Sequence, residues 1–313
     1  MSKEDYKVAI VGVGPSGGIL GAFLSQKGIE VTLVDIWIDH IEAIQRSGLK
    51  IAGVSDLTIS FDADHLKTSV KDLRGTDVDI VFIATKTPYL KRVVDDLKEV
   101  LPNDSLIVSH QNGLHTENVI LDVFGEERTF RDVINYAGNI VEAGKIDMTF
   151  FNPPNFVGAI SPSMNDTANA IAELMNSPEF GTISVEDIQP AVWKKVILNS
   201  ALAPVCAIAG QTMKEAMDFT DTNKLASELI REGIAVTEAI GISFGSDFHD
   251  ICMGYLSKGG HHKPSMLIDI ENRNPTEIDF LNGKIVELGK KNNVPVPFNE
   301  ATTTYVHAIE TKF

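Results

Sequence analysis

The pattern of apolar and polar residues divides the chain into two halves. In the first half, the apolar run Val8–Val11 leads into the glycine cluster GVGPSG, a helical segment and a second apolar run, Val31–Val34, which ends at Asp35. That order predicts strand, turn, helix, strand. The runs VDIVFIAT and SLIVSH, separated by the helical pattern PYLKRVVDDLKEVL, continue the alternation. Strands alternating with helices predict an α/β fold with a doubly wound parallel sheet.

The pattern changes twice further along the chain. Between about residues 129 and 185 it is rich in strand-like runs (INYAGNI, MTFF, NFVGAI, TISV), with one helical pattern at NDTANAIAELMN. We expect these runs to complete the sheet. From Ile188 onward only long helical patterns remain, among them AVWKKVILNSALAPVCAIAG and TEIDFLNGKIVELGKKN. The sequence therefore predicts one domain over residues 1–187 and a second, all-helical domain over residues 188–313.

The turn GVGPSG has the spacing of a dinucleotide-binding turn. Gly12 permits the tight turn, Gly14 lets the backbone approach a pyrophosphate, and Gly17 allows the helix to pack closely on the strand. The free N–H groups and positive dipole end of the helix favour phosphate. Asp35 can accept hydrogen bonds from the adenine ribose. The first domain is therefore predicted to be of Rossmann type, with a cofactor held by Asp35 and by the residues of the turn, Gly12, Val13, Gly14, Pro15, Ser16 and Gly17.

Composition narrows the class of partner. The chain is 43% apolar and 22% charged, which is ordinary for a globular protein, and its formal net charge is −16. This acidity disfavours binding to nucleic acid or to anionic membranes, because both need a basic surface. No apolar run reaches the roughly 18 residues of a membrane span, and MSKEDYK lacks the apolar core of a signal peptide. With two cysteines only, Cys206 and Cys252, we expect a cytoplasmic protein.

Two cofactor classes compete for the glycine turn. It also resembles the entry turn of flavin hydroxylases, which makes FAD an alternative. Those proteins usually carry a second motif built on Gly-Asp, a dipeptide that this chain lacks, so a nicotinamide is favoured. Asp35 would repel the 2′-phosphate of NADP and bond the 2′-hydroxyl of NAD, and the residues IWID after it supply no arginine. The sequence predicts NAD(H), with NADP less favoured.

The candidate chemistry of the second half lies in VWKKVILNSALAP. Hydride transfer to a carbonyl leaves negative charge on oxygen, so the site needs a proton donor or a cation there. Lys195 and Asn199 are four residues apart and share a helix face beside apolar neighbours. Lys195 could act as general acid in a partly dry cleft, or it could be a lysine that snorkels from an ordinary amphipathic helix. Spacing alone leaves both interpretations open.

A set of motifs in one order resembles the ketopantoate reductases (2-dehydropantoate 2-reductases) over nearly the full chain. GVGPSG opens the cofactor site, ATKT and HQNG end two successive strands, W-K-K-V-x-x-N begins the helical domain, and PSML, PTEIDFLNG and VPVPFN close it. The resemblance implies a 2-oxo acid reductase, an (R) or D product and a homodimer. The resemblance also implies roles for six residues of this chain: Lys86, Asn112, Lys195, Asn199, Ser265 and Glu277.

These roles are implied by the resemblance and not by spacing. Lys86 matches a lysine near the cofactor phosphates or ribose, and Asn112 an asparagine that touches both nicotinamide ribose and substrate. Lys195 matches the general acid, and Asn199 a substrate-binding amide. The alternatives stay open: Lys86 could be a solvated strand-end charge and Asn112 a turn residue.

Two further residues complete the implied site. Ser265 matches the serine that holds the substrate carboxylate, and it could also cap the helix that follows. Glu277 matches an acid that lies against the cofactor or the reacting oxygen and counts as catalytic, although it could serve helix-start electrostatics alone.

Departures from the family pattern bear on the substrate. Ala203 stands before Pro204 where the family commonly has an asparagine that helps to grip the distal hydroxyl of ketopantoate, and Pro264 replaces a usual serine. A more apolar pocket should select less for a hydroxylated side chain. With Asp35, these changes favour the family's NAD-dependent D-2-hydroxyacid dehydrogenases, which act on branched or aromatic 2-oxo acids. The alternatives are a 2-dehydropantoate 2-reductase proper and a non-catalytic NAD-sensing protein.

No metal site is predicted. His261 and His262 are adjacent in a Gly/Lys loop and lack the helical spacing of ligands or a nearby pair of carboxylates. We expect these two residues and His249 to be solvated loop histidines, and the sequence assigns them no role.

Overall fold

The computed structural model describes residues 6–313, which form two compact units. The α/β unit comprises the chain up to Gln111 together with His115–Ile188, and the helical unit comprises Asn112–Leu114 together with Gln189–Phe313. The predicted division between residues 187 and 188 did not include the segment 112–114, which belongs to the helical unit although it lies within the first half of the chain. Asn112 thus packs with the helices although it follows a strand of the sheet.

The α/β unit is built on a mostly parallel sheet with the strand order β12-β11-β8-β7-β6-β1-β2-β5. The order reverses on either side of β1, as in a doubly wound fold. Strand β11 runs antiparallel to β8, and the other neighbours are parallel. The strands are β1 (Lys7–Val11), β2 (Glu30–Val34), β5 (Leu66–Lys67), β6 (Ile80–Ile83), β7 (Leu106–Ser109), β8 (Thr129–Val133), β11 (Asn155–Ala159) and β12 (Thr182–Ser184).

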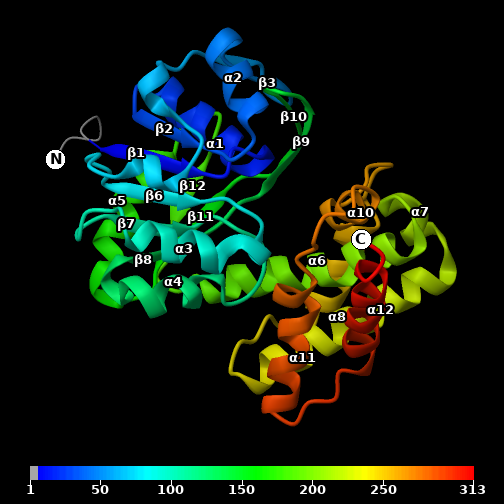
Figure 1. Cartoon of the computed structure of the whole chain (residues 1–313). Coiled ribbons are helices and arrows are strands. Elements are labelled where there is room, and N and C mark those ends of the chain that lie inside the picture. Colours follow the sequence, from blue (N-terminus) through cyan, green and yellow to red (C-terminus); the bar gives the residue numbers. More distant parts are fainter. Residues whose placement is uncertain (1–5) are drawn as a thin grey trace. The chain divides into compact units, whose positions relative to one another are not determined.

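Helices cover both faces of this sheet (Figure 1). Their bounds are α1 (Pro15–Gln26), α2 (Ile38–Ser47), α3 (Leu90–Lys98), α4 (Thr116–Phe124) and α5 (Asn165–Met175). The strands that pair at the centre are apolar on both sides, because each face is buried: Ile10 and Phe82 pack towards α1, whereas Val11 and Ile83 pack towards α3 and α4. The two buried faces fix the carboxyl ends of β1, β2, β6 and β7, where the predicted cofactor residues lie.

The prediction that all later strands complete the main sheet is wrong for two of them. Strands β9 (Tyr136–Glu142) and β10 (Lys145–Phe151) form a second, four-stranded sheet with β3 (Leu49–Gly53) and β4 (Leu57–Ile59), in the order β4-β3-β10-β9. This sheet packs on the outer side of α1, where Ile146 lies so close to Gly18 that an added Cβ would clash with it. Apolar alternation is the same in either sheet, so the sequence pattern could not separate them.

The helical unit is organised around α6 (Gln189–Ala209), which contacts helices α7, α8, α9, α10 and α12. The other helices are α7 (Met213–Asp218), α8 (Thr220–Ala239), α9 (Phe248–Leu256), α10 (Ser265–Glu271), α11 (Asn282–Lys291) and α12 (Pro297–Glu310) (Figure 1). Within residues 6–313, α6 is long and apolar enough to cross a membrane by length and composition, and 67% of the apolar window is buried inside the protein. A core helix shows the same properties.

The helix predicted from TEIDFLNG onward begins later than the pattern suggested. A short 3-10 turn, η7 (Ile278–Phe280), comes first, and α11 starts only at Asn282. Asn282 is completely buried, and its side-chain amide donates hydrogen bonds of 2.9 Å to the carbonyl of Ser200 and to Asn299 Oδ1. The amide contacts thus hold the start of α11 against the middle of α6.

Candidate functional site

The glycine turn between β1 and α1 has the geometry that each glycine was predicted to provide. Gly12 has a φ of +97°, and a Cβ there would stand 2.8 Å from the Thr85 nitrogen. A Cβ on Gly17 would stand 2.1 Å from the Gly12 carbonyl oxygen and 2.8 Å from the Ala84 side chain. Both positions therefore exclude any side chain, and the close approach of α1 to the sheet depends on them.

Gly14 differs from Gly12 and Gly17, because an added Cβ there would have no atom of residues 6–313 within 4 Å beyond those of Gly14 itself and its two chain neighbours. It is the N-cap residue of α1 and is followed by Pro15 at the first helical position, and none of the described side chains caps this helix. A helix N-terminus with open space over a glycine is an anion-binding geometry. The turn therefore fits the pyrophosphate of a dinucleotide.

Asp35 follows β2 and is fixed by two backbone hydrogen bonds. The Val13 N–H donates to Oδ2 at 2.6 Å, and the Trp37 N–H donates to Oδ1 at 2.9 Å. Each carboxylate oxygen retains a lone pair, so the group can still accept hydrogen bonds from a ribose. Asp35 thus ties the glycine turn to the segment that follows β2, at the place where the adenosine half of a dinucleotide binds in this fold.

Trp37 and His40, which the sequence interpretation missed, lie beside Asp35. Their rings stack with centroids 5.0 Å apart at an angle of 13°, and the outer ring, Trp37, is 41% exposed. His40 is completely buried, and burial lowers its pKa below the ordinary value of 6.5. The Gly144 N–H donates to its Nδ1 at 3.0 Å, so the neutral ring carries its proton on Nε2. An exposed tryptophan in IWID could have suggested an aromatic surface.

Two more segments reach the carboxyl edge of the sheet. Lys86 is half-buried three residues after the end of β6, where it precedes the 3-10 turn η4 (Thr87–Tyr89). Gln111 follows β7, and its side-chain amide donates to the Thr85 carbonyl at 2.6 Å. The residues ATKT and HQNG are therefore adjacent in the fold, as successive parallel strands require.

The face of α6 that carries Lys195 is the centre of the second group of predicted residues. Lys195 and Asn199 are half-buried and one helical turn apart, and Ala203 lies one turn further along the same stripe. The preceding residue, Lys194, is exposed. Position 195 therefore combines a cation with partial burial, which the neighbouring lysine does not.

Two other predicted residues, Asn112 and Glu277, belong to the same helical unit although they are far apart in the sequence. The Leu114 N–H donates to the Phe280 carbonyl at 2.7 Å, and Gly113 packs directly on Phe280, so Asn112 lies beside η7. The Asn112 Oδ1 atom is buried and has no hydrogen-bond partner within the described chain. Glu277, which precedes η7, is buried at 7% exposure. This arrangement leaves an amide acceptor suited to a hydroxyl donor.

Ser265 is the first residue of α10, a helix that packs on α6. The prediction that Ser265 could cap this helix is wrong, because the N-cap residue is Pro264 and none of the described side chains makes a capping bond there. The Ser265 side chain is exposed. Its hydroxyl is therefore not committed to helix capping, which leaves a ligand contact as the remaining prediction.

Several other candidate groups have structural partners. The expectation that His249 is a solvated loop histidine is wrong, because it lies on α9 with only 19% of its side chain exposed. Its ring contacts Ser227 Oγ at 2.9 Å and Asp250 Oδ1 at 3.0 Å, whereas His261 and His262 are exposed, as expected. Among residues 6–313 no group of three or more His, Cys, Asp or Glu side chains is placed to hold a metal ion. Cys206 is buried, as predicted, and burial raises the pKa of its thiol to about 12. A protonated buried thiol is a poor nucleophile.

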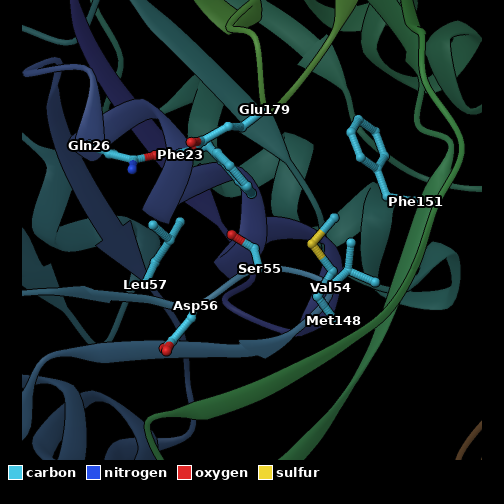
Figure 2. Close-up of a pocket in the computed structure, with 9 residues that line it drawn as sticks. All are labelled: Phe23, Gln26, Val54, Ser55, Asp56, Leu57, Met148, Phe151 and Glu179. Atoms are coloured by element: carbon cyan, nitrogen blue, oxygen red, sulfur yellow. The ribbon is translucent and has the colours of Figure 1, made fainter.

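The α/β unit contains a hollow of about 450 Å³ (Figure 2). It is lined by the last turns of α1, the β3–β4 turn and β10, with Phe23, Leu57 and Phe151 as apolar walls and Asp56 and Glu179 as acids. The glycine turn stands at the opposite end of α1. The hollow therefore contains none of the predicted site residues.

The fold and the turn define a Rossmann-type dinucleotide-binding protein with a helical second unit. Residues 8–161 match the family described as "Ketopantoate reductase PanE/ApbA", and residues 187–310 match its "C terminal" part. The chain belongs to the ketopantoate reductase family and is a ketopantoate reductase-like oxidoreductase.

Similar proteins cover the whole chain. A 2-dehydropantoate 2-reductase of Streptococcus pyogenes serotype M18 (strain MGAS8232) is 28% identical over 306 residues, 97% of either chain. A D-mandelate dehydrogenase solved with NADH and anilino(oxo)acetate has a TM-score of 0.88 at 22% identity and covers 98% of both chains. A dimeric ketopantoate reductase from Staphylococcus aureus has a TM-score of 0.79 at 20% identity, over 98% of this chain and 99% of that one.

Proposed function

We propose that this protein is an NAD-dependent D-2-hydroxyacid dehydrogenase that reduces branched or aromatic 2-oxo acids to (R)-2-hydroxy acids. The observation that carries the proposal is the stripe of Lys195, Asn199 and Ala203 on α6, where a half-buried cation and an amide are followed by a methyl group. This stripe supplies a proton donor and a polar contact next to an apolar surface. The similarity to a D-mandelate dehydrogenase supports the same class of substrate.

When bound, a reduced nicotinamide would supply the hydride that the carbonyl carbon of the 2-oxo acid accepts. Lys195 donates a proton to the carbonyl oxygen as negative charge develops there, so the products are the hydroxyl group and a neutral amine. Asn199 and Ser265 orient the substrate by hydrogen bonds, Ser265 at the carboxylate. The buried carboxylate of Glu277 would lie against the cofactor or the reacting oxygen, and the buried Asn112 Oδ1 would accept a hydrogen bond from the nicotinamide ribose.

We propose NAD(H) over NADP(H) because of Asp35. Its carboxylate is fixed on both oxygens by backbone N–H groups, so it cannot turn away from a 2′-phosphate without breaking two hydrogen bonds. The residues from Ile36 to Asp39 contain no lysine or arginine to hold that phosphate. The structural neighbour with NADH bound supports the same choice. Lys86 would contribute a cation for the cofactor phosphates or ribose.

Replacing Lys195 tests the mechanism, and its exposed neighbour offers a matched control. Lys195→Ala should lower kcat by about a hundredfold to ten-thousandfold because the general acid is lost, while the Kd for NADH stays within about twofold. Lys194→Ala removes the same charge from the same turn of α6 and should leave kcat near the wild-type value. Near wild-type turnover of the Lys195→Ala variant would refute the mechanism.

A substrate panel tests the specificity. We expect kcat/KM for 2-oxoisocaproate and phenylglyoxylate to exceed that for ketopantoate, because Ala203 offers no polar partner to a distal hydroxyl. The second candidate, a 2-dehydropantoate 2-reductase, is favoured by the full-length similarity to the Streptococcus pyogenes enzyme, and it predicts the reverse order. Binding of NADH without turnover of any panel member would instead favour an NAD-sensing protein.

We propose a homodimer, which the dimeric Staphylococcus aureus neighbour supports and light scattering would test. A cytoplasmic location agrees with the cysteines, since Cys206 and Cys252 are both buried free thiols.

A further inference from the structure

Three buried polar side chains that the proposed mechanism does not use form a chain of hydrogen bonds below the glycine turn. His110 follows β7, Asp132 lies on β8 and Tyr136 begins β9, and all three are buried. His110 Nδ1 contacts Asp132 Oδ2, and His110 Nε2 lies 2.9 Å from the Tyr136 hydroxyl. The Tyr136 hydroxyl lies 2.9 Å from the Ser16 carbonyl oxygen. The chain therefore ends on the first turn of α1.

The direction of each hydrogen bond follows from the carbonyl end of the chain. The Ser16 carbonyl can only accept, so the Tyr136 hydroxyl donates its single proton there. Tyr136 must then accept from His110, so Nε2 carries a proton. The contact between His110 Nδ1 and Asp132 Oδ2 needs a second proton, because two lone pairs would repel each other. The His110 and Asp132 pair therefore holds one proton between ring and carboxylate.

Burial and the nearby Asp132 charge raise the pKa of Tyr136 well above its ordinary value of 10.0. The phenol consequently stays protonated and keeps its role as donor to the Ser16 carbonyl. Packing restricts the His110 and Tyr136 rings further, since Phe82 contacts the edge of His110 and Phe180 packs on Tyr136. The hydroxyl is thus held in one orientation on the side of α1 that faces the second sheet.

The chain reaches the other predicted cofactor segments as well. His110 is followed by Gln111, whose side chain holds the Thr85 carbonyl in ATKT at 2.6 Å. Thr85 in turn packs on Gly12, where its nitrogen would stand 2.8 Å from an added Cβ. One connected set of contacts thus joins the end of β7, the end of β6 and both sides of the glycine turn.

From this connectivity we infer that His110, Asp132 and Tyr136 are positioning residues for the dinucleotide. They lock the first turn of α1 through Ser16, so that its N–H groups meet the pyrophosphate without rearrangement. The inference rests on the proposed NAD(H) function, and it adds residues that act through the backbone of α1 and do not touch the cofactor.

The variant Tyr136→Phe removes one hydroxyl and leaves the ring packing intact. The matched control is Ser105→Ala: Ser105 is equally buried at the other end of β7, and its hydroxyl donates to the Val78 carbonyl at 2.7 Å. For Tyr136→Phe we expect the Kd and the KM for NADH to rise about tenfold, with kcat at saturating NADH within about twofold. For Ser105→Ala we expect a lower Tm and an unchanged Kd.

A third variant tests the hydrogen-bond directions. In Asp132→Asn the new amide can donate to His110 Nδ1 and leave Nε2–H directed at Tyr136, so the Kd for NADH should stay within about threefold of wild type. Calorimetric titration with NADH measures all three variants. An unchanged Kd for Tyr136→Phe, an equal rise for Ser105→Ala, or a tenfold rise for Asp132→Asn would each overturn the inference. A wild-type protein that binds no NADH would refute the proposed function itself.

Discussion

The sharpest test of the glycine turn is the substitution of Gly14 by alanine. Gly14 has a φ of −68° and a ψ of −171°, which alanine adopts without strain. Within residues 6–313, no atom beyond those of Gly14 and its two chain neighbours lies within 4 Å of the added Cβ. Alanine at an N-cap costs about 0.5–1 kcal/mol relative to glycine, and the less flexible unfolded chain offsets about 0.4–1 kcal/mol. We therefore expect the free energy of unfolding to change by no more than about 1 kcal/mol.

Binding should respond much more strongly, because the new methyl group occupies the space over the helix N-terminus that the pyrophosphate needs. A loss of at least tenfold in NADH affinity corresponds to about 1.4 kcal/mol. Gly17→Ala is the contrasting variant: its Cβ would stand 2.1 Å from the Gly12 carbonyl oxygen, so overpacking should lower stability by about 1–3 kcal/mol or more. Thermal unfolding and calorimetric titration measure both effects. A Gly14→Ala protein that binds NADH like wild type would refute the assignment of the pyrophosphate to this turn.

Three further predictions concern specificity and pH. Replacing Asp35 by serine together with Ile36 by arginine should lower the ratio of kcat/KM for NADH to that for NADPH by at least about a hundredfold, and an unchanged ratio would contradict the role of Asp35. Burial lowers the pKa of His40, so as the pH drops below 6.5 the His40 ring is protonated in the unfolded chain but stays neutral in the folded one. The free energy of unfolding therefore falls as the pH drops below 6.5. His40→Asn keeps an acceptor for the Gly144 N–H and cannot titrate, so its Tm should fall less than that of wild type between about pH 7.5 and about pH 5.5. An equal fall in Tm for the two proteins would disprove the role of His40 in this loss of stability. Ala203→Asn should raise kcat/KM for ketopantoate relative to 2-oxoisocaproate by about tenfold, measured with the same substrate panel, and a constant ratio would remove Ala203 from the substrate surface.

The sequence predicted the parts of the fold that depend on local pattern. The glycine turn, Asp35 and the alternating strands and helices were placed correctly because each has a steric or electrostatic requirement that only a few residue types meet. Cys206 was placed in the core for the same kind of reason, since a small apolar side chain in an apolar helix has little alternative.

The parts that depend on long-range pairing could not be predicted. Strands β9 and β10 alternate like any half-buried strand, and only the long-range pairing of β10 with β3, together with the packing of Ile146 on α1, places them in a second sheet. His40 and Trp37 had no motif, because their importance comes from stacking on each other and from Gly144, which is distant in sequence. The membership of Asn112 in the helical unit rests on Phe280, a residue that no local pattern connects with HQNG.

Pro204 shows how such a long-range contact supports the candidate site. A proline within α6 has no N–H, so the carbonyl of Ser200 loses its helical donor. The Asn282 amide replaces that donor at 2.9 Å, and Asn282 is itself held by Asn299, whose amide donates to Glu232 at 2.7 Å. A buried carbonyl would otherwise remain unsatisfied in the middle of the helix. Side chains from α8, α11 and α12 therefore complete the hydrogen bonding of α6 around Pro204. The helix continues through the proline, and Lys195, Asn199 and Ala203 stay on one face.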